Sequence, residues 1–128
     1  MFAAMNLDFA KSDGLITAVI QDHSSGRVLM VGYMNEEAFR RTVETGFATF
    51  YSRSRRKLWL KGETSGHIQV VKELYIDCEG NSLLFKIEQK VAACHAGYFS
   101  CYYRRVNKDG NLEIAEKQVF NPDEAYKK

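Results

Sequence analysis

The sequence has few of the residues that interrupt or cross-link a chain. Its 128 residues include a single proline, Pro122, close to the C-terminal end, so no strand before it is broken by proline. Three cysteines are an odd number, which argues against a closed disulfide framework and favours reduced thiols in the cytoplasm. No apolar run approaches the ~20 residues of a membrane span, and the first residues lack the basic flank and apolar core of a signal peptide. These absences predict a cytoplasmic protein with no membrane partner.

Neither sign of charge dominates the composition. Lys plus Arg number 18 and Asp plus Glu number 16, a formal net charge of +2. So small a surplus does not require a nucleic-acid partner, and we expect none, but basic clusters can still meet a phosphorylated small molecule. The densest cluster is RSRRK at 53–57, in which arginine can bind phosphate bidentately. A solvated basic hairpin is the alternative interpretation.

Hydrophobic patterning predicts a chain made mostly of strands. Runs rich in β-branched and aromatic residues predict strands at 15–22, 27–34, 47–52, 68–78, 82–89 and 100–107, and residues 58–60 form a short apolar segment between them. In the run 68–78, we expect Ile68, Val70, Leu74, Ile76 and Cys78 to share one face, with Lys72 as an exception. The turn at 108–111 predicts a hairpin with a last short strand.

One helix is predicted after the second strand. Asn35 is a suitable N-cap and Gly46 a suitable stop, which predicts about ten helical residues between them. Phe39 and Val43 are expected on one face of this helix. We therefore predict an α+β fold, a mostly antiparallel β-rich domain with one main helix. The length indicates one domain over 1–128, with loosely ordered ends at 1–10 and 121–128.

The cysteines and one histidine are the strongest chemical signal. Cys78, Cys94 and Cys101 fall within 24 residues, and His95 directly follows the second of them. The spacing between Cys94 and Cys101 is not that of a C-x-x-C zinc knuckle but suits two ends of a loop. Three thiolates leave one position open, as in catalytic zinc, unless His95 or His67 fills it. Small buried hydrophobic residues are the alternative, and the clustering favours a metal.

Oxygen ligands alternate around the first cysteine. Asp77, Glu79 and Asn81 recur at every second position, which suits a hard cation. On an extended segment they would point to one face and Cys78 to the other. One chain could not easily bring both sites into one pocket, and sharing across a dimer interface would resolve this. A solvated turn is the alternative interpretation.

Several segments together resemble the phosphoribosyl-AMP cyclohydrolase family of histidine biosynthesis. They are GYMNEEAF (32–39), YSRSR (51–55), LWLKGETSGH (58–67), DCEGN (77–81) and ACHAGYFSC (93–101). The similarity covers roughly residues 8 to 106 in order, and the combination is far more specific than any one motif. We expect the monofunctional form, because the chain has no room for the pyrophosphohydrolase domain fused in some relatives.

The resemblance implies an interlocked homodimer with one zinc ion per subunit at the interface. Cys78 would come from one subunit, and Cys94 and Cys101 from the other. Zinc-bound hydroxide would attack C6 of the purine of phosphoribosyl-AMP and cleave the N1–C6 bond, the third step of histidine biosynthesis. His95 is the first candidate for proton transfer and His67 the second.

The resemblance also implies magnesium and a nucleotide substrate. Magnesium would be held by Asp77, Glu79 and Asn81, although the family usually has aspartate at the second and third of these places. Glutamate is one methylene longer and asparagine removes a charge, which alters a site that prefers tight octahedral oxygen geometry. The candidates for substrate binding are Arg53, Arg55 and Lys61 for the phosphates, with Glu63, Thr64 and Ser65 as further contacts.

Two other functions compete with this one. A different zinc-dependent nucleotide hydrolase, such as a deaminase, would need H-x-E followed by P-C-x-x-C, and His67 is followed by Ile68 and Gln69. A non-catalytic, basic nucleic-acid-binding module would use 53–57 and Trp59 and bind with a steep salt dependence. We expect Trp59 to be a core or pocket-wall residue.

Overall fold

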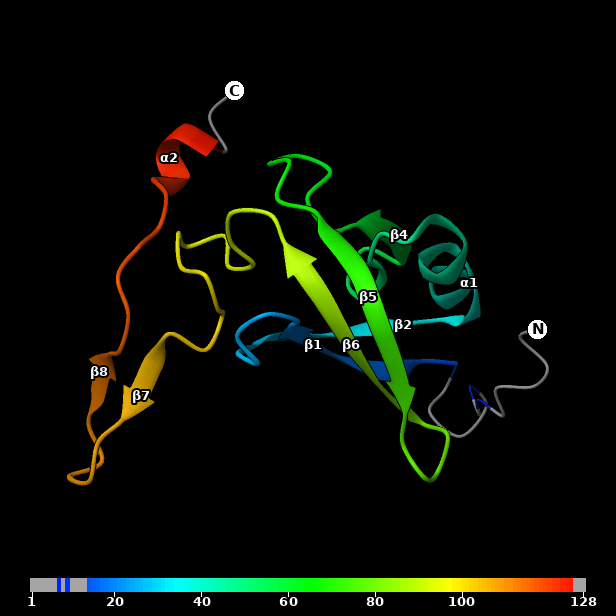
Figure 1. Ribbon diagram of the computed structural model, residues 1–128, viewed down its shortest axis with the longest axis horizontal. Coiled ribbons are helices and arrows are strands. Elements are labelled where there is room, and N and C mark those ends of the chain that lie inside the picture. The colour runs from blue at the N-terminus through cyan, green and yellow to red at the C-terminus, as the bar shows by residue number, and fades with distance from the viewer. Residues whose placement is uncertain (1–6, 8, 10–13, 126–128) are drawn as a thin grey trace.

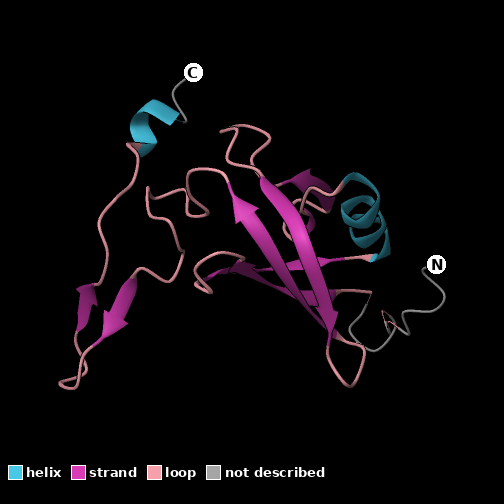
Figure 2. Ribbon diagram, viewed as in Figure 1, coloured by secondary structure: helices cyan, strands magenta, loops and turns pink. Residues whose placement is uncertain are grey.

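The computed structural model describes residues 7, 9 and 14–125 (Figure 1). Strands and loops make up most of this part of the chain (Figure 2). The elements are β1 (Ile16–Asp22), β2 (Val28–Met34), α1 (Glu36–Thr45), β3 (Thr49–Ser52), β4 (Lys57–Leu60), β5 (Gln69–Ile76), β6 (Ser82–Gln89), β7 (Arg104–Val106), β8 (Leu112–Ile114) and α2 (Pro122–Ala125). None of the helices in the described ranges has the length and apolar character needed to cross a membrane.

The structure describes only parts of the two chain ends that were predicted to be loosely ordered. Leu7 and Phe9 pack against the hydrophobic core, with the Phe9 ring 6.3 Å from that of Phe39. At the other end, Pro122–Ala125 form a short helix. The remainder of the predicted ends, at 1–6, 8, 10 and 126–128, lies outside the described residues.

A four-stranded sheet in the order β2-β1-β6-β5 forms the centre of the fold. The hairpin pairs β1–β2 and β5–β6 are antiparallel, as predicted, whereas β1 and β6 run parallel and join the two hairpins. The pairs β3–β4 and β7–β8 form separate two-stranded sheets. The predicted β-rich α+β class is confirmed, with a mixed central sheet.

The core lies on one face of this sheet. Ile16, Ala18 and Ile20 of β1 alternate inward, and Leu83, Phe85 and Ile87 of β6 do the same. Side chains of α1 and of the β3–β4 hairpin complete the cluster, and Figure 1 shows both elements near β2. On the opposite face, the side chains are half-buried or exposed.

Helix α1 begins and ends where the sequence predicts. The Asn35 side chain accepts a hydrogen bond from the Ala38 amide, and Gly46 ends the helix at φ 81°. Phe39 lies on its buried face as predicted, whereas Val43 is 40% exposed. The inward positions are Ala38, Phe39 and Thr42, and Thr42 Oγ1 contacts the main chain of Thr49. The helix therefore packs through a stripe that is partly polar and narrower than a face that includes Val43 would be.

Strand β5 is bulged, which changes the face of its first residues. Its pairing with β6 shifts between Val71 and Glu73, so that Lys72 has no partner in the register. A bulge reverses the alternation of side chains. Val71 packs against the core and Gln69 is fully buried. The prediction that Val70 shares the face of the later core residues is therefore wrong.

The stretch predicted as a strand at 100–107 is mostly irregular. Only Arg104–Val106 form β7. Ser100 is fully buried, and its hydroxyl donates a hydrogen bond to the Val28 carbonyl at 2.8 Å. The Ser100 amide donates to the Glu116 carboxylate at 3.1 Å, and the Cys101 amide to the Leu29 carbonyl at 2.7 Å. These contacts hold the chain against the start of β2, and they replace the regular hydrogen-bonded pairing of a β-strand.

Candidate functional site

A polar hollow of about 320 Å³ gathers most of the predicted substrate-binding and catalytic residues. The loop between β4 and β5 forms most of its wall, and His95, from the loop that follows Cys94, also lines it. Of the six predicted substrate-binding residues, Arg53 does not line it. The lining residues are Arg55, Trp59, Leu60, Lys61, Gly62, Glu63, Thr64, Ser65 and His95.

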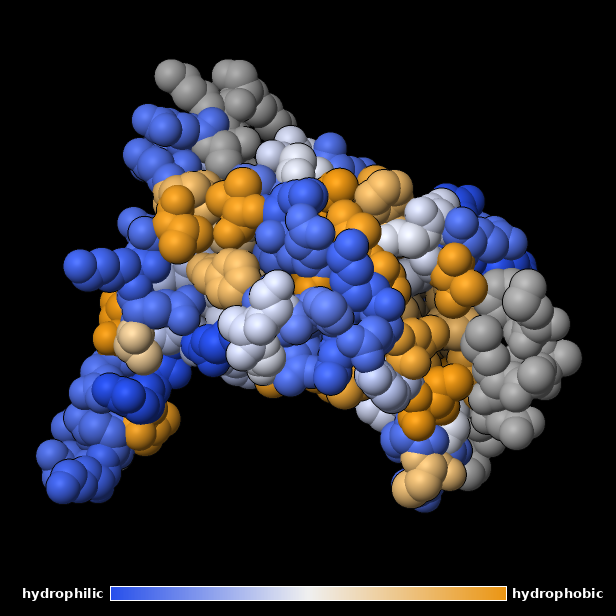
Figure 3. All heavy atoms as spheres, in the orientation of Figure 1, coloured by the Kyte–Doolittle hydropathy of each residue, from blue (hydrophilic) through white to orange (hydrophobic). Residues whose placement is uncertain are grey.

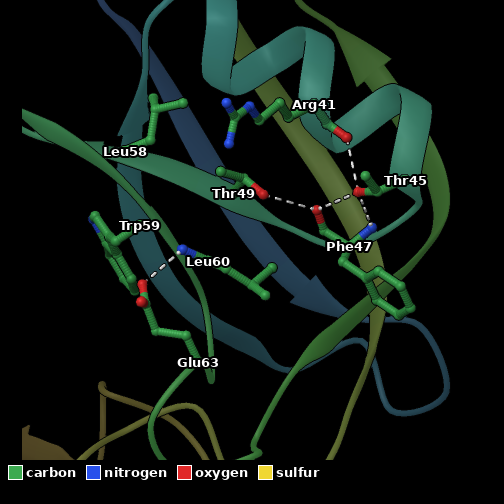
Figure 4. Close-up of a pocket in the computed structure, with 8 residues that line it drawn as sticks. All are labelled: Arg41, Thr45, Phe47, Thr49, Leu58, Trp59, Leu60 and Glu63. Carbon is green, nitrogen blue, oxygen red and sulfur yellow. Dashed lines mark hydrogen bonds between the residues drawn. The ribbon is translucent and has the colours of Figure 1, made fainter.

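The β4–β5 loop is folded tightly on itself. Gly62 has φ 87°, and a Cβ there would lie 2.5 Å from the main-chain carbon of His67. The Gly66 amide donates to the Gly62 carbonyl at 2.7 Å. Glu63 accepts a hydrogen bond from the Leu60 amide at 3.0 Å, as Figure 4 shows. Glu63 therefore already supports the turn with one carboxylate oxygen.

Lys61 connects this loop to the loop that carries the last two cysteines. Its side-chain nitrogen donates a hydrogen bond to the Ala93 carbonyl oxygen at 2.6 Å. Burial lowers the pKa of the Lys61 ammonium group, while the nearby charges of Cys101 and Cys94 act in the opposite direction. The residue predicted to bind phosphate thus lies beside the thiol pair.

The thiols of Cys94 and Cys101 come together in one chain. Main-chain hydrogen bonds from Ala93 to Phe99 at 2.9 Å and from Cys94 to Tyr98 at 3.2 Å fold the intervening loop back. Cys101 retains accessible surface as a residue, but burial around its thiol raises its pKa to about 11. The charge of Cys94 and a hydrogen bond with it add to this rise, and Lys61 opposes it. Such a pair of sulfur ligands suits zinc.

Cys78 lies far from this pair. It is exposed in the turn between β5 and β6, whereas Cys94 and Cys101 follow the opposite end of β6. The eight residues of β6 span about 26 Å. Within the described residues, no three His, Cys, Asp or Glu side chains form a group that could hold a metal. One subunit therefore brings together two of the three predicted zinc ligands.

The segment from Asp77 to Asn81 is a turn and not an extended strand. Asp77 Oδ1 accepts hydrogen bonds from the amides of Asn81 at 2.9 Å and Ser82 at 3.1 Å. Gly80, at φ 73°, donates to the Asp77 carbonyl at 3.1 Å. The expected alternation of oxygen ligands and Cys78 on opposite faces is therefore wrong, and the alternative interpretation of a solvated turn is confirmed. The distance from Cys94 and Cys101, and not strand alternation, separates Cys78 from them.

The two histidines differ in their surroundings. His95 is exposed and lines the polar hollow. His67 is only 8% exposed, and its ring packs edge-on against Phe120 with 4.6 Å between ring centres. Burial, and secondarily the charge of Lys61, lowers the pKa of His67. His95 is thus better placed to exchange protons with a ligand in the hollow.

Two buried glutamines hold the loops of the site, and sequence analysis did not identify them. Gln69 and Gln89 face each other across β5 and β6, with 2.8 Å between Nε2 of the first and Oε1 of the second. The Gln89 amide nitrogen also donates to the main-chain oxygens of His67 at 3.0 Å and Ala92 at 3.1 Å. One sign of Gln89 was present in the sequence: position 89 follows the alternation of inward-facing residues in β6, yet it carries a polar side chain.

Trp59 forms a wall between three hollows. Arg53 lies in a second one, where its guanidinium is 4.2 Å from the centre of the Tyr33 ring. The third lies between α1 and the β3–β4 hairpin (Figure 4). Its surface is more apolar, with Phe47 and Leu60 among the lining residues. The prediction of Trp59 as a pocket wall is confirmed, and Arg53 is separated from the other predicted phosphate ligands.

Comparison with known proteins gives a consistent result. The family model for phosphoribosyl-AMP cyclohydrolase matches residues 30–103. The phosphoribosyl-AMP cyclohydrolase of Solibacter usitatus is 63% identical, over 95% of this chain and 97% of its own length. The phosphoribosyl-AMP cyclohydrolase of Desulforapulum autotrophicum is 56% identical, over 96% of this chain and 99% of its own length. The phosphoribosyl-AMP cyclohydrolase of Methanothermobacter thermautotrophicus is 54% identical, over 89% of this chain and 83% of its own length.

Proposed function

Because the chain belongs to the phosphoribosyl-AMP cyclohydrolase family, we propose that it opens the purine ring of phosphoribosyl-AMP at a site shared by two subunits. The reaction is hydrolysis of the N1–C6 bond, the third step of histidine biosynthesis. The observation that supports a shared site is the convergence of Cys94 and Cys101 at the end of the sheet opposite to Cys78. The three free thiols agree with a cytoplasmic enzyme.

Zinc fits the thiol pair of one subunit together with Cys78 of the partner subunit. Cys94 and Cys101 interact directly, and Cys78 is exposed in a turn that another molecule can reach. Three thiolate ligands leave one coordination position open, as catalytic zinc requires. A zinc ion held there would activate a water molecule for attack at neutral pH.

The side chains of the polar hollow would bind the substrate and move protons. His95 would carry the proton that the ring nitrogen gains when the N1–C6 bond breaks. Arg55 would bind one phosphate, and the hydroxyls of Thr64 and Ser65 would donate to the same ligand. Arg53, in the neighbouring hollow, would bind the second phosphate. Lys61 would hold the cysteine loop against the hollow through Ala93.

Magnesium fits the turn at 77–81 less well. One oxygen of Asp77 is already hydrogen-bonded to two main-chain amides. Asn81 contributes no charge, and Glu79 is exposed on the turn. This set does not provide the three free, charged oxygen ligands that the resemblance implies, so we assign magnesium no step in the reaction.

Mixing two inactive variants tests the shared site. Cys78→Ser and Cys94→Ser should each abolish ring opening and zinc retention when produced alone. When they are coexpressed, a mixed dimer combines Cys78 of one subunit with Cys94 and Cys101 of the other at one of its two sites. Random pairing makes about half of the dimers mixed, so activity should approach about a quarter of the wild-type value.

The control is coexpression of Cys94→Ser with Cys101→Ser. In this mixed dimer each site lacks one ligand, so it should stay inactive. If Cys78→Ser with Cys94→Ser also stays inactive while mixed dimers form, the ligands do not come from two subunits. Ring opening by the wild-type protein is followed by absorbance with phosphoribosyl-AMP, and its absence would contradict the proposed activity itself.

A further inference from the structure

The β7–β8 hairpin has one apolar face that is open to solvent. In its register Val106 pairs with Leu112 and Arg104 with Ile114, while Arg105 pairs with Glu113. Alternation therefore places Val106, Leu112 and Ile114 on one face, together with Arg104 at its edge. Their exposed fractions are 64%, 62% and 62%. The opposite face carries the ion pair between Arg105 and Glu113 at 2.7 Å.

This hairpin reaches away from the rest of the subunit. Figure 3 shows it projecting at the lower left, with hydrophobic atoms among hydrophilic ones. An isolated two-stranded hairpin is marginally stable in water. A projecting hairpin with three large apolar side chains on one face is typical of a segment that packs against another molecule.

A matching apolar row crosses the outer face of the central sheet. Val19 of β1 pairs directly with Val31 of β2 and with Leu84 of β6, and Leu84 pairs with Tyr75 of β5. These four residues, one from each strand, form a continuous row on the face opposite the core. Val31 and Tyr75 are 41% and 48% exposed, and Val19 and Leu84 are half-buried.

We propose that the apolar face of the β7–β8 hairpin packs on this row in a second copy of the chain. The inference rests on the proposed shared site and identifies the surfaces that assemble it. By symmetry each subunit would give one hairpin and receive one, which closes a dimer. Burial of both apolar surfaces provides the driving force.

The positions of the cysteines argue for a second copy as the occupant. Arg104 begins β7 three residues after Cys101, and Tyr75 precedes Cys78 by three residues. Three extended residues span about 10 Å. Packing of the hairpin on the partner's row therefore brings Cys101 towards the Cys78 turn of that partner. In one subunit the hairpin and the β5–β6 turn lie on opposite sides of the molecule (Figure 1).

Two variants with opposite charges test this contact. Leu112→Asp on the hairpin and Val31→Lys on the row should each weaken the dimer roughly tenfold to hundredfold, measured by sedimentation velocity over a range of concentrations. An equimolar mixture should recover dimers. In a mixed dimer one contact is unchanged, and the other places the introduced carboxylate of the hairpin near the introduced ammonium group of the row. Because only folded subunits can reassemble, recovery separates a lost contact from misfolding.

A charge at the exposed hairpin turn provides the control. Lys108→Asp, which adds the same side chain away from the apolar face, should leave the dimer unchanged. Wild-type protein that is monomeric at every concentration, or Leu112→Asp and Val31→Lys proteins that dimerise as tightly as wild type, would overturn the proposed contact. Ring opening by the same wild-type sample tests the proposed function separately: an active wild type with unaffected Leu112→Asp dimers contradicts the contact alone.

Discussion

The side-chain nitrogen of Lys61 lies 2.6 Å from the main-chain oxygen of Ala93. This hydrogen bond joins the β4–β5 loop, which lines the polar hollow, to the loop of Cys94 and Cys101. The two loops are separated by the whole β5–β6 hairpin in the chain. The contact therefore couples the wall that we predict to bind substrate to the predicted zinc ligands.

Removal of the Lys61 amine should loosen this coupling. Lys61→Met keeps most of the side-chain volume but leaves the Ala93 carbonyl without its donor, which should lower the free energy of unfolding by about 1 to 3 kcal/mol. We expect kcat and zinc retention to fall together, with a smaller change in KM. Lys57→Met, at an exposed position of β4, is the control for loss of charge and should behave like wild type. A large rise in KM with unchanged kcat and zinc content would instead assign Lys61 to phosphate binding.

Alanine at Gly62 should be far more disruptive than alanine at Gly66. Both glycines have positive φ, at 87° and 83°, but only the Cβ at position 62 would meet main-chain atoms of His67 and Ile68. Gly66→Ala should cost about 1 kcal/mol of unfolding free energy for backbone strain alone. Gly62→Ala should cost roughly 3 kcal/mol or more and reduce ring opening, because the hollow is formed by this loop. Denaturant unfolding of both variants checks this difference, and equal losses would contradict it.

Glycine at position 91 should stabilise the protein. Val91 has φ 60°, a left-handed conformation that is costly for a β-branched residue. Val91→Gly should raise the free energy of unfolding by up to about 1 kcal/mol, since relief of strain exceeds the added chain entropy. Val119 is equally exposed, at 53% against 52%, and is not among the described non-glycine residues with positive φ. Val119→Gly should lower the free energy of unfolding by roughly 0.5 to 1 kcal/mol. If denaturant unfolding shows that both variants change this free energy in the same direction, the strain argument is refuted.

The buried His67 should make the protein sensitive to acid. Because its pKa is lowered from 6.5 in the folded state, the unfolded chain takes up a proton at this residue at higher pH than the folded chain does. Stability from His67 is therefore fully present above pH 6.5 and is lost as the pH falls through the lower, folded-state pKa. His67→Phe should unfold with a shallower pH dependence in this acidic range. Thermal unfolding of both proteins over a pH series is the measurement, and parallel curves would show that another group titrates.

Restoration of aspartates in the β5–β6 turn should strengthen magnesium binding. Glu79→Asp together with Asn81→Asp adds one charge and shortens one side chain beside Asp77. Affinity for a hard cation rises with the number of charged ligands. We expect a gain of roughly tenfold or more in Mg²⁺ affinity by calorimetry. Asn111→Asp, in the turn between β7 and β8, adds a charge elsewhere and should cause no gain.

The elements that sequence analysis predicted well are those built from local contacts. The caps of α1 involve Asn35 with Ala38 and Gly46 with Thr42, partners only three or four residues apart. Strand β6 occupies the predicted residues because its inward alternation is continuous from Leu83 to Gln89. Such contacts depend on side-chain chemistry and backbone preference over a few residues, which can be read directly from the chain.

What sequence analysis missed depends on partners that are distant in the chain or on the local course of the backbone. The bulge at Lys72 exists only in the pairing of β5 with β6, and it decided which face Gln69 and Val71 present. The Asp77 carboxylate was expected in a strand, but its hydrogen bonds to Asn81 and Ser82 form a turn. The bulge and the turn leave the order of hydrophobic and polar residues unchanged, so the hydrophobic pattern of the sequence revealed neither of them.

The sequence alone determined the family, the thiols available to a metal and most of the polar side chains that line the hollow. Those conclusions depend on residue types and their order, which the motifs carry. Only the tertiary structure decided the spatial arrangement: Cys94 and Cys101 lie beside Lys61, and Cys78 lies at the other end of β6. The physical reason is that a strand holds its two ends apart, while a loop bound by main-chain hydrogen bonds brings its ends together.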